Sequence, residues 1–227
     1  MNIMVAAAGV DRSVVDGLRS ALESSGRGRS VELTGPGDQP VLLARDNGGA
    51  AMRSAGAGSR HLVVLGSGLR ALASSGGAAE ALLSSADDGL LDGAPDDLVA
   101  VLADADAGLL VAAAGRANER LFLAEPTSGG IVVSSHLATL VRALGAPVDR
   151  SYEDFLLGYG FLPDGRTSFD GIRALAPGER WCWRSEQVVV ERIAPPAVTP
   201  CDPPASRDQA VASLAESFYR AVERQAA

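Results

Sequence analysis

The sequence predicts an α+β protein in which strands outnumber helices. Apolar side chains recur at helical spacing in residues 11–22 and 135–144, and residues 181–192 alternate as a β-hairpin with residues 185–187 near its tip. Short apolar runs bounded by glycine or polar turns, which are typical of buried strands, occupy residues 1–8, 61–65, 109–114 and 131–133.

The other elements have weaker signals. Residues 97–103 fit a helix or a strand, and residues 151–157 form a short helix that Ser151 could cap and that Gly158 and Gly160 end. We further expect strands at 31–33 and 41–44, short helices at 69–73 and 78–83, and a strand at 121–125 that returns along 109–114.

Composition limits the possible functions. The chain has 227 residues, enough for one domain with a real core, and is 47% hydrophobic but only 4% aromatic, so that core must consist of Ala, Val and Leu. A net charge of −8 argues against binding nucleic acid or an anionic membrane surface. All positive side chains are arginine, which excludes a Schiff-base or phosphate-binding lysine.

The C-terminal part reads as a separate helix. Residues 194–205 form a proline-rich linker, and residues 206–209 form a capping box that opens a helix to about residue 225. Its apolar stripe consists of Val211, Leu214, Phe218 and Val222. A lone helix of this length is marginal in water, so we expect these four residues to dock on a partner.

One segment resembles a known family. The segment runs from the end of the helix at 151–157 through a connector to the closing hairpin, and its matching residues are Leu157, Gly158, Tyr159, Pro163, Thr167, Phe169, Gly171, Ile172, Leu175, Pro177 and Gly178. Their order and spacing resemble those of asparagine synthetases. Arg120, Leu121, Leu123, Ala124, Ser135, Leu137 and Leu140 extend the resemblance, although Glu125, Pro126 and Thr127 replace the family's usual Asp-Arg-x-Gly.

The resemblance implies a glutaminase-type domain over residues 1–193, with the αββα sandwich of N-terminal-nucleophile hydrolases: two stacked, mainly antiparallel sheets between helices. Such a domain needs a cysteine after the initiator methionine, and this chain has Asn2. The family's oxyanion-donating Asn-Gly pair becomes Leu65-Gly66. We therefore expect no catalytic residue and a domain that does not hydrolyse glutamine.

Relatives without this cysteine, the β-lactam synthetases and lasso-peptide macrolactam cyclases, resemble the pattern most. They imply a silent N-terminal domain or subunit of an ATP-dependent amide ligase. Residues 206–227 would begin its adenylating domain, supplied by a second chain or a missing C-terminal part. Ser75-Gly76-Gly77 and Ser128-Gly129-Gly130 do not continue as the family's pyrophosphate loop, so ATP and magnesium are expected only in that partner.

Two alternatives stay open. The chain could be a non-catalytic peptide- or protein-binding module in a biosynthetic pathway, or an active hydrolase. The final helix could dock on a second copy of the chain (self-association) instead of on a ligase domain. An active hydrolase would need an unrecognised nucleophile such as Ser13, Ser67 or Ser135. The cysteines and histidines form no metal-ligand pattern, and without a signal peptide or membrane-length apolar run we expect a cytoplasmic protein.

Overall fold

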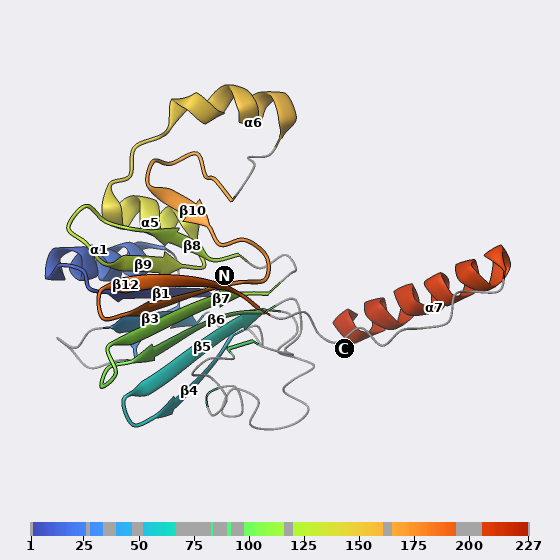
Figure 1. Ribbon diagram of the computed structural model, residues 1–227, viewed down its shortest axis with the longest axis horizontal. Helices are drawn as coiled ribbons and strands as arrows, with labels where there is room; N and C mark the ends of the chain where they lie inside the picture. The colour runs from blue at the N-terminus through green and yellow to red at the C-terminus, as the bar shows by residue number, and fades with distance from the viewer. Residues whose placement is uncertain are drawn as a thin grey trace.

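The computed structural model describes residues 2–25, 28–33, 40–46, 52–66, 83, 90–91, 98–115, 120–160, 165–193 and 206–226. Two six-stranded sheets dominate it, and every pair of neighbouring strands is antiparallel. Figure 1 shows the two sheets stacked face to face.

The first sheet has the order β10 (Ile172–Ala174), β8 (Phe122–Ala124), β9 (Ile131–Ser134), β1 (Ile3–Ala8), β3 (Val41–Asp46) and β2 (Arg29–Glu32). The second has the order β12 (Gln187–Arg192), β11 (Glu179–Arg184), β7 (Leu109–Ala114), β6 (Leu98–Asp104), β5 (Arg60–Gly66) and β4 (Met52–Ala57). The chain therefore crosses between the sheets three times.

The main core lies between the sheets. Met4, Ala6 and Ala8 of β1 belong to the same buried cluster as Val63 and Leu65 of β5. The alternate residues of β1 instead face the helices outside the first sheet. A strand covered on both faces needs no polar side chain, which is why β1, β6 and β7 read as unbroken apolar runs.

Helices α1 (Arg12–Ser24) and α5 (Leu137–Leu144) cover the outer face of the first sheet. The buried Arg45 on β3 donates hydrogen bonds to the carbonyl oxygens of Leu22 (2.5 Å) and Glu23 (2.9 Å) near the end of α1. The Leu22 carbonyl oxygen also accepts the amide hydrogen of Ser25 at 3.2 Å, so the guanidinium and the Ser25 amide cap the helix together.

Leu83, Leu90, Leu91 and Ile193 pack on the outer face of the second sheet, opposite the main core. The molecule thus has the predicted N-terminal-nucleophile hydrolase-like αββα arrangement. The short helices expected at 69–73 and 78–83 fall outside the described residues, apart from Leu83.

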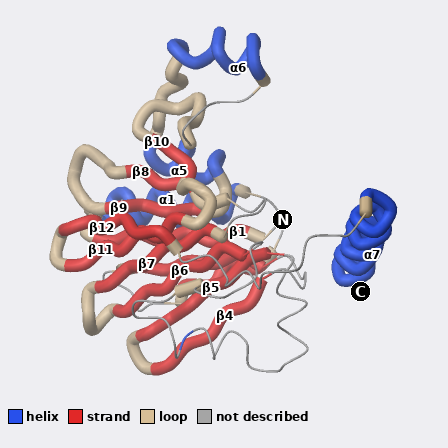
Figure 2. Tube along the Cα trace, turned by 45° about the vertical axis from the view of Figure 1, so that its right-hand side comes forward, coloured by secondary structure: helices blue, strands red, loops and turns tan. Residues whose placement is uncertain are grey.

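Two helices lie away from the sandwich. α6 (Glu153–Tyr159) follows a 3-10 turn (Arg150–Tyr152) and stands beyond β10, and Gly160 ends it in the left-handed conformation at φ 73°. α7 (Arg207–Ala226) lies apart from both sheets in Figures 1 and 2. One of the two hydrogen bonds of the expected capping box is present: the Gln209 backbone amide donates to Ser206 Oγ at 3.2 Å.

Several sequence expectations need correction. The segment 121–125 does not return along β7, because β8 lies in the first sheet between β9 and β10. Of the segment 97–103, which fitted a helix or a strand, the described residues 98–103 belong to the strand β6; β4 was not expected at all. Ser151 does not cap α6; its amide and hydroxyl instead donate to Asp149 Oδ1 at 2.9 and 2.6 Å.

Candidate functional site

The start of β1 is the position at which the resemblance places the catalytic nucleophile. Asn2 directly precedes this central strand. Since side chains alternate along a strand, Asn2 shares the side of Met4, Ala6 and Ala8, which face the space between the sheets. An amide side chain thus occupies the place of the thiol, and amides do not act as nucleophiles of this kind.

Leu65 and Gly66 lie at the corresponding end of the second sheet. At the far end of β1, Gly9 approaches Trp183 of β11, which pairs with Leu110 at the start of β7. Since β7 is antiparallel to β6 and β6 is antiparallel to β5, the starts of β7 and β5 lie at the same end of the second sheet. The end of β1 is therefore near the start of β5. Because the strands of stacked sheets run roughly parallel or antiparallel to one another, the start of β1 lies toward the end of β5. The Leu65 side chain is buried in the core between the sheets and offers no hydrogen-bond donor there.

The serines considered as alternative nucleophiles are not paired with a base in the described part of the chain. Ser135 Oγ accepts the amide hydrogen of Met4 at 3.0 Å, which ties β1 to β9. Ser13 is exposed in the first turn of α1, and Ser67 lies outside the described residues. The neighbouring His136 uses Nδ1 in a 2.8 Å hydrogen bond with Thr139.

His136 belongs to a polar chain that joins β9, α5 and α1. The buried Thr139 lies 3.2 Å from Ser25 Oγ, which in turn donates to the carbonyl oxygen of Ala21 at 2.6 Å. Burial lowers the pKa of His136 below its ordinary value of 6.5, and Arg142 and the α-amino group act in the same direction. The imidazole is therefore held in its neutral form.

The connector of the family-like segment is fixed by Thr167. Its buried hydroxyl donates to the carbonyl oxygen of Ile172 at 2.7 Å and accepts the Phe169 amide hydrogen at 3.2 Å. Gly171, at φ 70°, turns the chain back so that Arg166 pairs with Arg173 in an isolated antiparallel bridge. Thr167 and Ile172 are buried, whereas Phe169 is only half-buried, against the α1–α5 layer.

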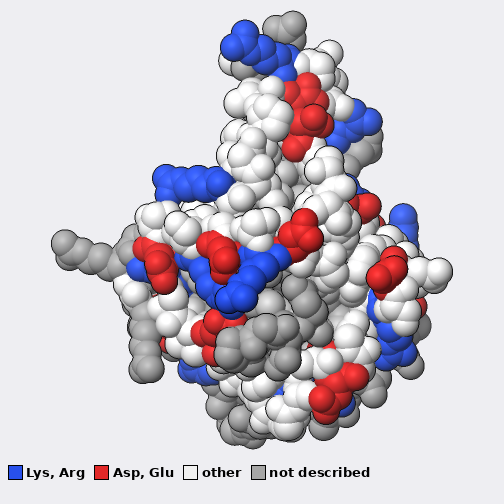
Figure 3. Space-filling view, turned by 90° about the vertical axis from the view of Figure 1, so that its left-hand side faces the viewer, with Lys and Arg blue, Asp and Glu red and all other residues white. Residues whose placement is uncertain are grey.

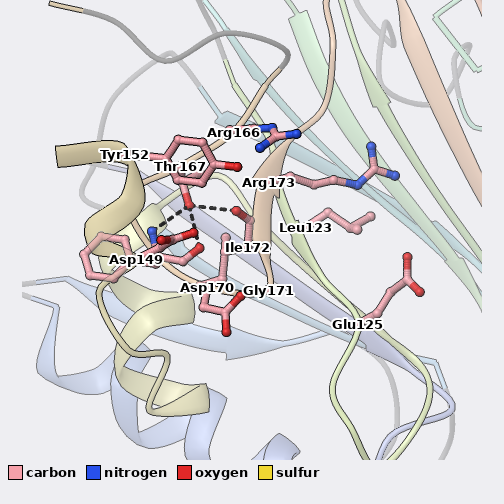
Figure 4. Close-up of a pocket in the computed structure, with 11 residues that line it drawn as sticks. Leu123, Glu125, Asp149, Tyr152, Arg166, Thr167, Asp170, Gly171, Ile172 and Arg173 are labelled. Atoms are coloured by element: carbon pink, nitrogen blue, oxygen red, sulfur yellow. Dashed lines mark hydrogen bonds between the residues drawn. The ribbon is translucent and has the colours of Figure 1, made fainter. Parts of the chain in front are cut away.

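This connector lines a pocket of about 350 Å³ at the edge of the first sheet. Its charged lining residues are Glu125, Asp149, Asp170, Arg166 and Arg173. In Figure 4 the two guanidinium groups lie on one side of the pocket, while the carboxylates of Asp170 and Glu125 lie below them. Sequence reasoning missed both arginines, although they flank the Thr-x-Phe-x-Gly-Ile motif that it singled out.

A second hollow, of about 530 Å³, adjoins the first and shares Glu125, Asp170, Gly171 and Ile172 with it. The rest of its lining comes from the start of α1, the 124–128 turn and the segment after α5. The glycines of Ser128-Gly129-Gly130 follow that turn directly, and a Cβ on Gly130 would lie 2.4 Å from the Ala8 carbonyl oxygen. These glycines serve a tight turn against β1.

The predicted docking stripe on α7 is exposed. Val211 is 58% exposed, Leu214 72%, Phe218 64% and Val222 47%. Tyr219 is also 67% exposed and forms an edge-on contact with Phe218, with ring centroids 6.1 Å apart. The helix thus presents apolar side chains that the described part of this chain does not cover.

Surface charges are interspersed. On the face shown in Figure 3 the largest group of basic atoms is bordered by Asp and Glu side chains. Arg19, for example, lies 2.8 Å from Asp16 and 2.7 Å from Glu32. Among the described residues no group of three or more His, Cys, Asp or Glu could hold a metal ion, and none of the described helices has the length and apolarity needed to cross a membrane.

The described sheets and helices form an αββα sandwich with the fold of the N-terminal-nucleophile hydrolases. No family model and no curated protein matches the chain. Among solved structures, the glutamine phosphoribosylpyrophosphate amidotransferase of B. subtilis, complexed with ADP and GMP, matches at a TM-score of 0.51 and 10% identity over 86% of this chain.

A structure of the allosteric regulatory enzyme of purine biosynthesis matches at a TM-score of 0.49 and 11% identity, again over 86% of this chain. In both cases the match covers 49% of the other chain, so this chain spans about half the length of those enzymes. At such low identity the likeness to the B. subtilis enzyme establishes the fold alone.

Proposed function

We propose that this chain is the catalytically silent N-terminal domain or subunit of an asparagine-synthetase-like, ATP-dependent ligase that forms an amide bond, as in a lactam or macrolactam. In this role the αββα sandwich supports a separate adenylating domain, which binds ATP and magnesium. One observation carries the proposal: Asn2 stands before the central strand, where a glutaminase of this fold needs its nucleophile.

Two further observations support it. Leu65 is packed in the core at the position of the expected oxyanion donor. The hydrogen bonds of the Thr167 hydroxyl with Ile172 and Phe169 fix the conformation of the family-like connector, as expected for a domain with a structural role. A ligase that uses an amine of its own substrate needs no ammonia. The absence of the cysteine nucleophile at Asn2 and of the oxyanion donor at Leu65 is therefore compatible with ligase activity.

The test uses the full chain, alone and together with the adenylating protein encoded nearest to it. The chain alone should release no ammonia from glutamine and should exchange no pyrophosphate into ATP. The two proteins should copurify, and the exchange activity of the adenylating protein should rise when the chain is added. Ammonia release by the chain alone, or an adenylating protein indifferent to it, would count against the proposal.

A repair experiment tests the silence directly. Asn2→Cys alone should not create a glutaminase, because Leu65 leaves one oxyanion donor missing, and such a loss costs on the order of 3–4 kcal/mol in the transition state. The matched variant combines Asn2→Cys with Leu65→Asn. If the single variant hydrolyses glutamine at a turnover number of about 1 per second or faster, the missing donor is not what limits this site.

A second candidate function is a non-catalytic peptide- or protein-binding module of a biosynthetic pathway. The pocket and the adjoining hollow at the edge of the first sheet favour it. Capture of a precursor or carrier peptide without any ligase would distinguish this function from the first.

A further inference from the structure

The Arg166–Arg173 pair is an unusual feature of the pocket. The two residues lie directly opposite each other in their isolated antiparallel bridge. Residues paired in this way project their side chains to the same side, and like charges placed so are destabilising. Figure 4 shows the two guanidinium groups close to each other in this view, at one side of the pocket.

Aromatic rings, rather than carboxylates, hold these guanidinium groups. Arg173 Cζ lies 3.8 Å from the ring centroid of Trp181, and Arg166 Cζ lies 5.0 Å from that of Tyr152. Within the described part of the chain, neither arginine forms an ion pair with Asp or Glu. A guanidinium that lies over an aromatic face keeps its N–H groups, which point outward in its own plane, available for an anion.

Negative charge lies elsewhere in the same pocket. Asp170 and Glu125 are exposed lining residues, and Figure 4 places their carboxylates apart from the two guanidinium groups. The third lining carboxylate, Asp149, accepts the Ser151 amide and hydroxyl hydrogens on Oδ1. The pocket therefore holds two positive charges apart from the carboxylates of Asp170 and Glu125. A ligand with one negative and one positive group would pair with both the guanidinium groups and the carboxylates. The pocket volume of about 350 Å³ is ample for a molecule of amino-acid size.

We propose that this pocket binds a free α-amino acid, with its carboxylate on Arg166 and Arg173 and its ammonium group toward Asp170 and Glu125. Arginine matches a carboxylate with paired N–H donors, so the pair fixes the orientation of the ligand. Asn2 and Leu65 do not line this pocket, so it is separate from the glutaminase position. The inference does not depend on the proposed ligase role.

The experiment titrates the full chain with each of the twenty proteinogenic amino acids, with acetate and with inorganic phosphate. Binding is followed by calorimetry and by tryptophan fluorescence, since Trp181 lies under Arg173. We expect at least one amino acid to bind more tightly than acetate or phosphate. Arg166→Gln and Arg173→Gln should each weaken that binding at least tenfold.

Two further variants test the dipolar character of the ligand. Asp170→Asn and Glu125→Gln should weaken amino-acid binding while leaving acetate binding unchanged. Arg53→Gln is the matched control, because Arg53 is an exposed arginine on β4, which forms the far edge of the second sheet, and it should change nothing. Melting temperatures of all variants show whether a loss of binding reflects a loss of fold.

The contrary outcomes are definite. The proposal is wrong if no amino acid shows binding at concentrations up to about 10 mM. A dissociation constant above that value corresponds to a binding free energy weaker than about 3 kcal/mol. It is equally wrong if binding persists in folded Arg166→Gln and Arg173→Gln proteins, which would place the ligand elsewhere. Acetate or phosphate binding as tightly as every amino acid would remove the role assigned to Asp170 and Glu125.

Discussion

At the residue scale, the close approach of Gly9 to Trp183 limits what the chain tolerates at the end of β1. Gly9 has φ 63°, and a Cβ there would lie 2.4 Å from Trp183 Cζ2. Gly9→Ala should therefore lower the free energy of unfolding by about 2–4 kcal/mol, through backbone strain and overpacking together. Urea denaturation measures the change.

Gly58 provides the matched control for this prediction. It has nearly the same backbone, at φ 61°, but a Cβ there would meet nothing within 4 Å. Gly58→Ala should cost only the backbone part, about 1 kcal/mol. Equal losses in the two variants would mean that Trp183 moves aside at no cost.

His136 makes the stability of the fold depend on pH. Its pKa is lowered in the folded state, so the unfolded chain binds the proton more readily than the folded chain does. The contribution of the neutral imidazole to stability is therefore complete above the unfolded pKa of about 6.5, and it is lost as the pH falls from that value through the lower pKa of the folded state. Acidification from about pH 7.5 to 5.5 should lower the melting temperature, and less so in His136→Gln.

Arg142 supplies a second variant for the same prediction. The positive charge of Arg142 opposes protonation of His136. Arg142→Gln should therefore raise the pKa of the folded imidazole and shrink the pH dependence without abolishing it. Identical slopes of melting temperature against pH in wild type and His136→Gln would show that another group is responsible.

At the element scale, the β11–β12 hairpin is joined by a turn whose two residues are poorly suited to it. Ser185 and Glu186 have φ 51° and 63°, which is the type I′ geometry that favours Asn-Gly. Replacing them with Ser185→Asn and Glu186→Gly should raise the free energy of unfolding by about 1 kcal/mol. Glu186→Ala, which removes the charge but keeps a Cβ, should bring no such gain in the same denaturation assay.

Two kinds of element could be identified from the sequence: those with one clear period, and the bounded apolar runs that became β1, β5 and β7. α1 and α5 bury one face, and the hairpin alternates, with Trp181 and Trp183 in the main core and Cys182 toward the outer cluster. β6 stayed ambiguous because it is buried on both faces and has no period. β4 was missed because only its first residue, Met52, is buried, as suits an edge strand.

Pairing between strands was harder to predict than the strands themselves. Sequential strands usually pair, so the segment after β7 was expected to return along it. The chain instead crosses to the other sheet at that point. The pocket was missed for a similar reason: Arg166 and Arg173 are brought opposite each other only by the tight turn through Gly171.

At the scale of the whole molecule, α7 is expected to find its apolar partner in another domain or another copy. Phe218 is 64% exposed at the middle of the stripe, and an isolated helix gains most of its stability from packing such a face. Phe218→Asp should abolish that contact, because it would place a charge in an apolar interface from which water is excluded. Light scattering and limited proteolysis, with and without the adenylating protein, measure the loss.

Ser213→Asp is the matched control, since Ser213 lies on the same helix and is likewise exposed but is not part of the stripe. It should leave the association intact. If Phe218→Asp unfolds the whole chain while the wild type is a monomer, α7 belongs to the core of this domain and the docking prediction fails.

The central place of β1 has a consequence for synthesis on the ribosome. β1 pairs with β3 on one side and with β9 on the other, and β9 ends at Ser134, 88 residues after β3 ends at Asp46. At translation rates of 5–20 residues per second, roughly 4 to 18 s separate the appearance of the two partners. During that interval β1 presents an unpaired, wholly apolar edge, so the nascent chain is most prone to misassembly before its second half has emerged.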